Sequence, residues 1–484
     1  MLKNFVSARL ALVVICCVSA IGSKAFEANA LVDRVDLPDV PGFKPIQLAD
    51  LPDLMDEVET KVSKSGKLNS NGLVSTINYE SFKKRQPPCK EETLRLSCDE
   101  TGFAGEITVR LFAQCKSAPL AVTLLGFDQS CTEKLPRAWQ AYLYQSGCHV
   151  LTFDSIIRNN MNCCTGHGVA GNFIEEARIV AKLIDAVLDE KRKDGPKLKE
   201  CVTSVRLLGT SYGGLLALQT LRQPQAKTWP LDRVLVLSTP LNMTTAAKRL
   251  DTFAREDKPF FGLLDLMKLL DGFTPKNAQP SPKEEALMRA GIGYCFHGNL
   301  QGLAKSNIDR YDPELVERLK AWDEKPEQRQ LEKEMLENLL DRQTQEMKAC
   351  AKECEDKSKS EFEHAREALK GKHKVQLNVA KRRPSQVEEW NFQDYVLLLL
   401  KPYWKMKRAA TPPVTLSELL AGAPNFVQVF VAADDPLNDP QELQEFRKKL
   451  SPPQMTVIPY GGHLGFGGSR WAEALVTKFF ATGK

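Results

Sequence analysis

Short, continuous apolar runs recur along this chain, and they constrain its fold more than any other feature. The runs are residues 120–127, 148–154, 202–209, 233–240, 426–433 and 454–460. A continuous apolar run of this length is typical of a strand buried on both faces of a parallel sheet. Segments whose apolar residues have helical spacing separate some of the runs, most clearly residues 174–193. Strands that alternate with helices predict an α/β fold, with a mostly parallel central sheet and helices on both faces.

The alternation stops between the fourth and fifth runs. Residues 243–395 contain no good strand and are largely helical and charged, which predicts a large helical insertion within one α/β core. Inside it, residues 259–273 have one apolar helical face, which fits either packing on the core or contact with acyl groups or lipid. That face consists of Phe260, Leu263, Leu264, Met267 and Leu270. The predicted divisions are a signal peptide (1–25), an N-terminal arm with the first strands (26–104), the first part of the core (105–242), the insertion (243–395) and the second part of the core (396–484).

The N-terminus has the layout of a secretory signal peptide. Lys3 and Arg9 accompany an apolar run at residues 10–18, and small residues follow. The run is shorter than the roughly 20 residues that cross a membrane. We therefore expect an exported protein, either secreted or periplasmic. The formal net charge of +5 over 484 residues gives no reason to expect a nucleic-acid partner.

Cysteine usage bears on the same question. Of the 13 cysteines, Cys16 and Cys17 lie within the signal segment and 11 remain. In an exported chain this predicts disulfides with at least one thiol left over. Cys89 and Cys98 form the best local pair. Residues 350 and 354, both cysteines one helical turn apart, fit either a pair or two free thiols.

Ser211 stands in the sequence Gly-Thr-Ser-Tyr-Gly, residues 209–213, at the end of an apolar run. A helical run follows from Leu215, so this G-x-S-x-G motif occupies a strand-to-helix turn. So sharp a turn strains the serine backbone, and Gly209 and Gly213 avoid clashes on either side of it. The hydroxyl is then presented above the sheet, at the positive end of the next helix. The pattern predicts a nucleophile at Ser211.

A serine hydroxyl needs a base to take its proton, and the base needs a third group to orient it. Only His463 of the six histidines follows a strand near the end of the chain, in a glycine-rich loop. Asp435 follows the run at 426–433 and is the expected acid, with Asp434 and Asp439 as alternatives. A purely structural role for His463 also stays open. The other histidines are His149, His167, His297, His364 and His373.

Acyl transfer also needs two backbone N–H groups that stabilise the developing negative charge. We expect one from Tyr212, directly after the nucleophile, and the other from the loop after residues 120–127, at Phe127. The alternative for this loop is that Gly126 only forms a turn.

These motifs resemble the α/β-hydrolase superfamily. Within it, AADDPLND at 432–439 followed by GGHLGF at 461–466 is similar to the YheT-like branch, which includes the embryogenesis-associated hydrolases. The likeness covers residues 105–242 and 385–484. It implies the α/β-hydrolase fold, hydrolysis of a carboxylic ester or a lipid-like acyl substrate, and an insertion that covers the active site. It also implies that no metal and no cofactor is needed.

The resulting hypothesis is an exported serine hydrolase with Ser211, His463 and Asp435 as its catalytic residues. One alternative is another reaction on the same three residues, such as peptidase or acyltransferase chemistry. A second is a non-catalytic binding protein, in which the helical insertion contacts a protein partner or a membrane surface.

Overall fold

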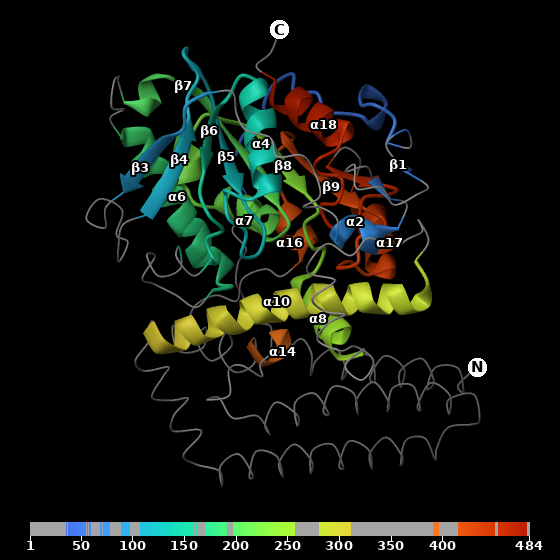
Figure 1. Ribbon diagram of the computed structural model, residues 1–484. Coiled ribbons are helices and arrows are strands. Elements are labelled where there is room, and N and C mark those ends of the chain that lie inside the picture. The colour runs from blue at the N-terminus through green and yellow to red at the C-terminus, as the bar shows by residue number, and fades with distance from the viewer. Residues whose placement is uncertain are drawn as a thin grey trace, which may run out of the picture.

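The apolar runs form one eight-stranded sheet in the computed structural model of the protein (Figure 1). Across the sheet the strand order is β10-β9-β8-β7-β5-β6-β4-β3. The strands are β3 (Glu92–Leu96), β4 (Ile107–Phe112), β5 (Ala118–Leu124), β6 (His149–Thr152), β7 (Val202–Thr210), β8 (Leu231–Leu237), β9 (Val427–Ala432) and β10 (Met455–Ile458). Only β4 pairs antiparallel with both of its neighbours in this sheet. A small second sheet pairs β1 (Val58–Glu59) with β2 (Leu68–Asn69).

The structure describes the sheet, the helices around it and part of the insertion. In full, it describes residues 35, 37–54, 56, 58–59, 68–69, 71–77, 89–96, 107–158, 161, 170–190, 197–256, 280–310, 391–395, 415–450 and 454–481. Outside these residues lie the predicted signal peptide at 1–25, the apolar helix at 259–273 and the charged run at 313–384. Cys98, Cys350 and Cys354 also lie outside them.

The strand order and orientation are those of the α/β-hydrolase fold, so the expected fold class is confirmed. The parallel strands end at one edge of the sheet. Gly209 at the end of β7 pairs with Leu124 at the end of β5, and Ala432 pairs with Ile458 at the ends of β9 and β10. The loops that follow these strands are therefore brought to the same edge, which is where open α/β sheets bind ligands.

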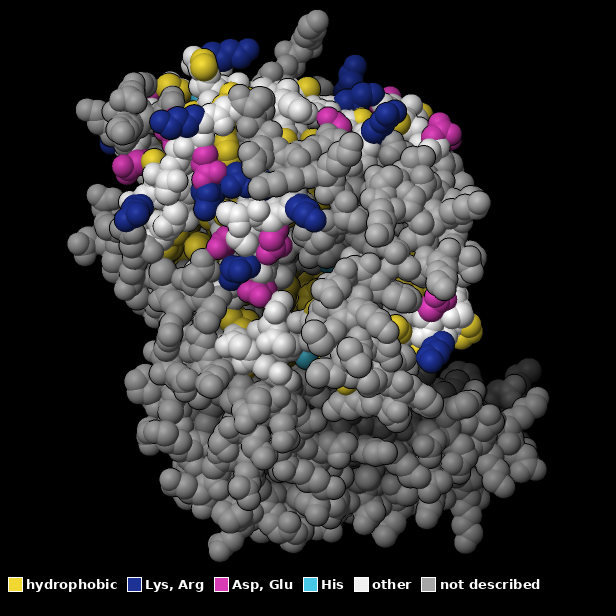
Figure 2. Space-filling view, in the orientation of Figure 1, with side chains coloured by type: hydrophobic (Ala, Val, Ile, Leu, Met, Phe, Trp, Pro, Cys, Tyr) yellow, Lys and Arg dark blue, Asp and Glu magenta, His cyan; other side chains and the backbone are white. Residues whose placement is uncertain are grey.

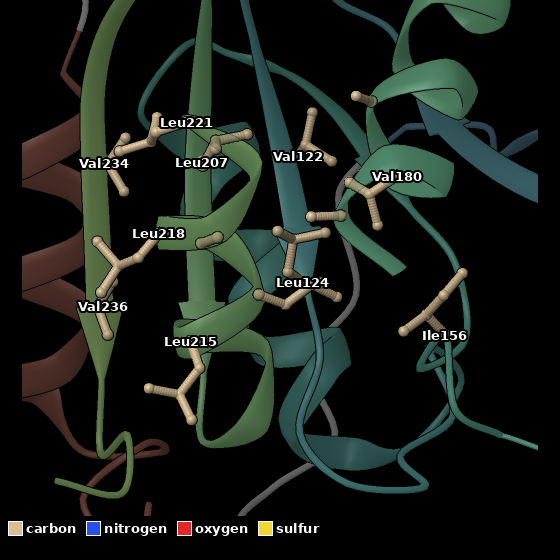
Figure 3. Packing of buried hydrophobic residues seen from close by; sticks show 14 of the residues in the cluster. Val122, Leu124, Ile156, Val180, Leu207, Leu215, Leu218, Leu221, Val234 and Val236 are labelled. Carbon is tan, nitrogen blue, oxygen red and sulfur yellow. The ribbon is translucent and has the colours of Figure 1, made fainter. Parts of the chain in front are cut away.

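Helices cover both faces of the sheet because alternate strand residues point to opposite sides. Val122, Leu207 and Val236 pack on the face covered by α6 (Phe173–Asp189) and α7 (Tyr212–Thr220). Figure 3 shows Leu215 and Leu218 of α7, and Leu221 directly after the helix, on this face. Also on this side are α16 (Leu416–Leu420) and α17 (Pro440–Lys449). The opposite face, with residues such as Leu208 and Leu235, is covered by α4 (Lys134–Gln145) and α18 (Arg470–Phe480).

The described parts of the predicted insertion are helical. They are α8 (Met243–Glu256), α10 (Pro282–Arg310) and α14 (Phe392–Tyr395). In Figure 1 the long helix α10 crosses the molecule beyond the carboxyl ends of the parallel strands. It packs on α8, on α14 and on the short arm helix α2 (Gly72–Ile77). The described part of the insertion therefore lies against the edge of the sheet that carries Ser211.

The expected disulfides are not found among the described residues. Cys89, the described member of the expected Cys89–Cys98 pair, is a free thiol. It lies just before β3, where its partly buried side chain packs on an apolar cluster and is hydrogen-bonded to Tyr144. Burial raises the pKa of the Cys131 thiol to about 12, which keeps it protonated and unreactive. The other free cysteines are Cys115, Cys148, Cys201 and Cys295.

The molecular surface mixes charges of both signs. On the face shown in Figure 2, basic and acidic side chains of the described residues lie next to one another around the sheet. In the described part of the chain no helix is long and apolar enough to cross a membrane.

Candidate active site

Ser211 occupies a tight turn between β7 and α7. Its backbone has φ 52° and ψ −124°, which is a strained conformation for a residue with a side chain. The glycines beside it are required by close packing. A Cβ on Gly213 would lie 2.1 Å from the carbonyl oxygen of Leu124, and one on Gly209 would lie 2.6 Å from that of Gly213. The tight packing of β7, α7 and the end of β5 therefore holds the serine in this turn.

Three side chains from separate strand ends form one hydrogen-bonded series. The Ser211 hydroxyl oxygen lies 2.7 Å from His463 Nε2, and His463 Nδ1 lies 2.9 Å from Asp435 Oδ2. Since a carboxylate only accepts hydrogen bonds, Nδ1 carries the proton and Nε2 offers its lone pair to the hydroxyl. Ser211 is 6%, His463 6% and Asp435 3% exposed, so the series is shielded from water. A hydroxyl beside a neutral, oriented imidazole is the arrangement in which a serine loses its proton most readily.

The structure distinguishes Asp435 from the two alternative acids. Besides His463, Asp435 binds the backbone N–H of Leu437 at 2.9 Å, which orients its carboxylate. Asp439 instead caps the N-terminus of α17, where it accepts from the backbone N–H of Gln441 at 2.8 Å. Asp434 points to the loop before His463 and does not share the series.

The alternative histidines that the structure describes have other partners. His149 accepts a hydrogen bond from the backbone N–H of Gln114 at 3.0 Å. His297 in α10 lies 2.9 Å from Asp251 in α8. The remaining three, His167, His364 and His373, lie outside the described residues.

The loop that carries His463 is held through four consecutive backbone amides. Asp434 accepts from the N–H groups of residues 461 and 462, at 3.3 and 2.8 Å. Thr76 accepts from the N–H of His463 at 2.8 Å, and Ser238 accepts from that of residue 464 at 3.2 Å. Burial raises the pKa of Asp434 to about 6, although the two N–H donors oppose the rise. The sequence pattern did not reveal these anchors, because each is defined only by contact with a distant loop.

The predicted backbone donors flank the serine. Tyr212 is the first residue of α7, where the helix leaves its N–H groups unpaired. On the other side, a Cβ on Gly126 would lie 3.1 Å from the Cβ of Ser211. The peptide that joins Gly126 to Phe127 is therefore next to the serine. Both predicted positions lie beside Ser211, and their role in stabilising negative charge stays a prediction.

A buried carboxyl group lies behind Tyr212. The Tyr212 hydroxyl donates to Glu176 Oε2 at 2.6 Å, and the backbone N–H of Gly171 donates to Glu176 Oε1 at 2.6 Å. The ring of Phe173 stacks on that of Tyr212 with centroids 4.9 Å apart. Burial raises the pKa of Glu176 to about 7, although both hydrogen bonds favour its ionised form. The residue after the nucleophile is thus fixed at its backbone and at its side chain.

Aromatic rings join the insertion to the loop after β5. The Phe127 ring lies 5.8 Å from that of Phe296 in α10 and 5.8 Å from that of Phe392 in α14, measured between centroids. It also lies 6.4 Å from the ring of Tyr212. The neighbourhood of Ser211 is therefore apolar on the side of the insertion. Within the described ranges, no cluster of His, Cys, Asp and Glu side chains could hold a metal ion.

Comparisons with known proteins give similarities of low identity. No protein-family model and no curated protein matches the chain. Among solved structures, it is similar to naproxen esterase (carboxylesterase NP) from Bacillus subtilis, at 13% identity and a TM-score of 0.39, over 84% of this chain and 95% of that one. It is also similar to the Pyrococcus furiosus esterase PF2001, at 11% identity and a TM-score of 0.37, over 82% and 97% of the two chains.

A third similarity is partial. Est1E from Butyrivibrio proteoclasticus matches at 17% identity and a TM-score of 0.23, over 30% of this chain and 51% of that one.

Proposed function

We propose that this protein is a serine hydrolase that cleaves carboxylic esters. The observation that carries the proposal is the buried series from Ser211 through His463 to Asp435, with distances of 2.7 and 2.9 Å. A buried and strained serine has no structural reason to be held beside an oriented imidazole. Nucleophilic catalysis supplies that reason.

In the proposed reaction, the Ser211 oxygen attacks the ester carbonyl carbon while His463 Nε2 takes its proton. The N–H groups of Phe127 and Tyr212 bind the carbonyl oxygen as it becomes negative. The protonated His463 then gives its proton to the leaving alcohol, and an acyl-enzyme remains. Water attacks this ester, again with His463 as base, and releases the acid and free Ser211.

The substrate class follows from the surroundings of Ser211. Phe127, in the loop after β5, contacts both Phe296 and Phe392 of the insertion, which favours an apolar acyl group over a charged one. We infer that the insertion acts as a lid over this site. The likeness of residues 432–439 and 461–466 to the YheT-like branch supports the same substrate class. Separately, the signal-like segment at residues 1–25 supports export.

The test is the replacement of Ser211 by Ala in the full chain, with short-chain and long-chain acyl esters as substrates. We expect kcat to fall by at least about 10³-fold, because the nucleophile is lost while binding remains. Ser204→Ala is the matched control, since Ser204 is a buried serine of β7, the strand that leads to Ser211. Undiminished turnover by Ser211→Ala would exclude the mechanism.

Two further readouts separate the alternatives. A fluorophosphonate probe should label the wild-type protein and fail to label Ser211→Ala. A folded wild-type protein that is neither labelled nor active on any ester would favour a binding role. Preferential transfer of the acyl group to an added alcohol would indicate an acyltransferase, and cleavage of peptides in place of esters would indicate a peptidase.

A further inference from the structure

We propose that the arm helix α2 is part of the active site, and that Thr76 is a positioning residue for His463. The inference depends on the proposed function, because it assigns a role in the same reaction. Thr76 and His463 are 387 positions apart in the sequence. The sequence predicted an N-terminal arm with the first strands over residues 26–104 and no role for this arm in the active site.

The first observation is the fixed hydroxyl of Thr76. It donates its hydrogen to the carbonyl oxygen of Gly72 at 2.6 Å and accepts from the backbone N–H of His463 at 2.8 Å. Because a hydroxyl has only one hydrogen, the bond to Gly72 leaves its lone pairs for His463. Thr76 is 8% exposed and His463 is 6% exposed, so water does not readily replace this contact.

The second observation is direct backbone packing between α2 and the elements that carry the acid and the base. A Cβ on Gly72 would lie 1.9 Å from the carbonyl oxygen of Asp434, and one on Gly462 would lie 2.2 Å from that of Gly72. A Cβ on Gly465 would lie 2.4 Å from the carbonyl oxygen of Ser75. At these three glycines the two backbone segments approach each other more closely than any side chain would allow. A shift of α2 would therefore move the His463 loop.

The third observation is that α2 is held from its other side by the insertion. Val74 of α2 and Met288 of α10 are both fully buried and share a small apolar cluster of their own. Asn71, just before α2, donates from its side chain to Glu285 of α10 at 3.2 Å. The arm helix thus lies between the insertion and the histidine loop, and Figure 1 shows it above one end of α10.

From these contacts we infer that Thr76 acts by holding His463 in place and not by binding the substrate. The imidazole must keep Nε2 on the Ser211 hydroxyl and Nδ1 on Asp435 at the same time. Small displacements of a catalytic group cost about 10²-fold in rate. Loss of the Thr76 acceptor should therefore lower kcat, because Thr76 holds the backbone of His463. KM should stay nearly unchanged, because the proposed role of Thr76 does not involve substrate binding.

The experiment compares Thr76→Val, Thr76→Ser and a matched control in the full chain, with an acyl ester as substrate. Valine keeps the shape and removes the hydroxyl, whereas serine keeps the hydroxyl. Thr220→Val is the control, because Thr220 is a fully buried threonine whose hydroxyl donates to the carbonyl oxygen four residues earlier, at 2.8 Å. We expect kcat to fall about 10- to 100-fold for Thr76→Val with KM within about 2-fold. Thr76→Ser and Thr220→Val should stay within about 3-fold of the wild type.

A folded Thr76→Val protein with the kcat of the wild type would overturn the inference. So would a loss in Thr76→Ser as large as in Thr76→Val. Should Thr76→Val not fold at the assay temperature, Met288→Ala decides, with Met288→Leu as its control. Met288→Ala removes the apolar contact between α10 and Val74 of α2 without touching the loop, and an unchanged kcat in the folded variant would count against the role of α2. Failure of the proposed function looks different, because the wild type itself would then be inactive or Ser211→Ala would be as active as the wild type.

Discussion

At the scale of single residues, the decisive group is the carboxylate that faces His463. Asp435 is fully shielded at its side chain and binds the Nδ1 of His463 and the N–H of Leu437. Its neighbour Asp434 has the same side chain, but its carboxylate accepts hydrogen bonds from two backbone amides of the histidine loop. Two adjacent aspartates thus have different tasks, and substitution separates them.

Asp435→Asn should lower kcat by about 10⁴-fold while the protein stays folded. The amide that replaces the carboxylate donates as well as accepts, so it no longer requires the proton of His463 to sit on Nδ1. Steady-state kinetics with an ester substrate measures the loss.

Asp434→Asn is the control for this prediction. It keeps one carbonyl oxygen for the glycine amides of the loop, so its kcat should fall by no more than about 10-fold. A larger loss in Asp434→Asn than in Asp435→Asn would reverse the assignment of the acid.

At the scale of elements, the turn between β7 and α7 depends on backbone contact with the end of β5. Gly213 lies so close to Leu124 that even a methyl group has no room. A strand, a turn and a neighbouring strand end therefore act as one unit that sets the position of Ser211. Such a unit is sensitive to any added side-chain volume at Gly213.

Gly213→Ala should lower the free energy of unfolding by about 3 kcal/mol, because the added methyl group forces the turn and β5 apart. Chemical denaturation measures the change. Gly298→Ala is the control, because no atom lies within 4 Å of the added Cβ in the middle of α10. There the substitution should stabilise the protein by about 0.5–1 kcal/mol, since alanine favours a helix. Equal effects of the two substitutions would contradict the packing argument.

At the scale of the whole molecule, stability and pH are linked through carboxyl groups buried near the site. Burial raises the pKa of Glu176 from its ordinary 4.5 to about 7, and that of Asp434 from 3.8 to about 6. At pH values between the ordinary and the raised pKa of each group, the folded state binds more protons than the unfolded state. Stability contributed by these groups is therefore present at low pH and is lost as the pH rises through about 6 for Asp434 and through about 7 for Glu176.

We expect Glu176→Gln to remove much of this dependence. The charged groups and acids that face Glu176 are Tyr212 on α7 and Glu175 on its own helix, and neither supplies a compensating positive charge. Each unit of pKa difference corresponds to about 1.4 kcal/mol of pH-dependent stability. Thermal or chemical unfolding from pH 5 to 8 should show a flatter profile for the variant than for the wild type. Parallel profiles would contradict the assignment.

The sequence predicted much of this molecule where local patterns carry the information. Continuous apolar runs predicted the parallel strands β5 to β10, and G-x-S-x-G predicted the sharp turn at Ser211. The alternation of apolar and polar residues at 106–114 also predicted the antiparallel strand β4. The run at 92–96 was not singled out, because β3 is an edge strand with a partly exposed pattern instead of a continuous apolar one. The disulfide expectation was not met among the described cysteines, since Cys89 packs as an apolar group.

The sequence alone determined which segments form the buried strands and which turn carries a serine, because hydrophobic period and glycine spacing are properties of neighbouring residues. Only the tertiary structure decided which of three aspartates meets His463, and that Thr76 and Ser238 hold its loop. It also decided that Glu176 lies buried behind Tyr212. The physical reason is that a hydrogen bond depends on distances of about 3 Å between groups hundreds of residues apart, and strand order and helix packing set those distances.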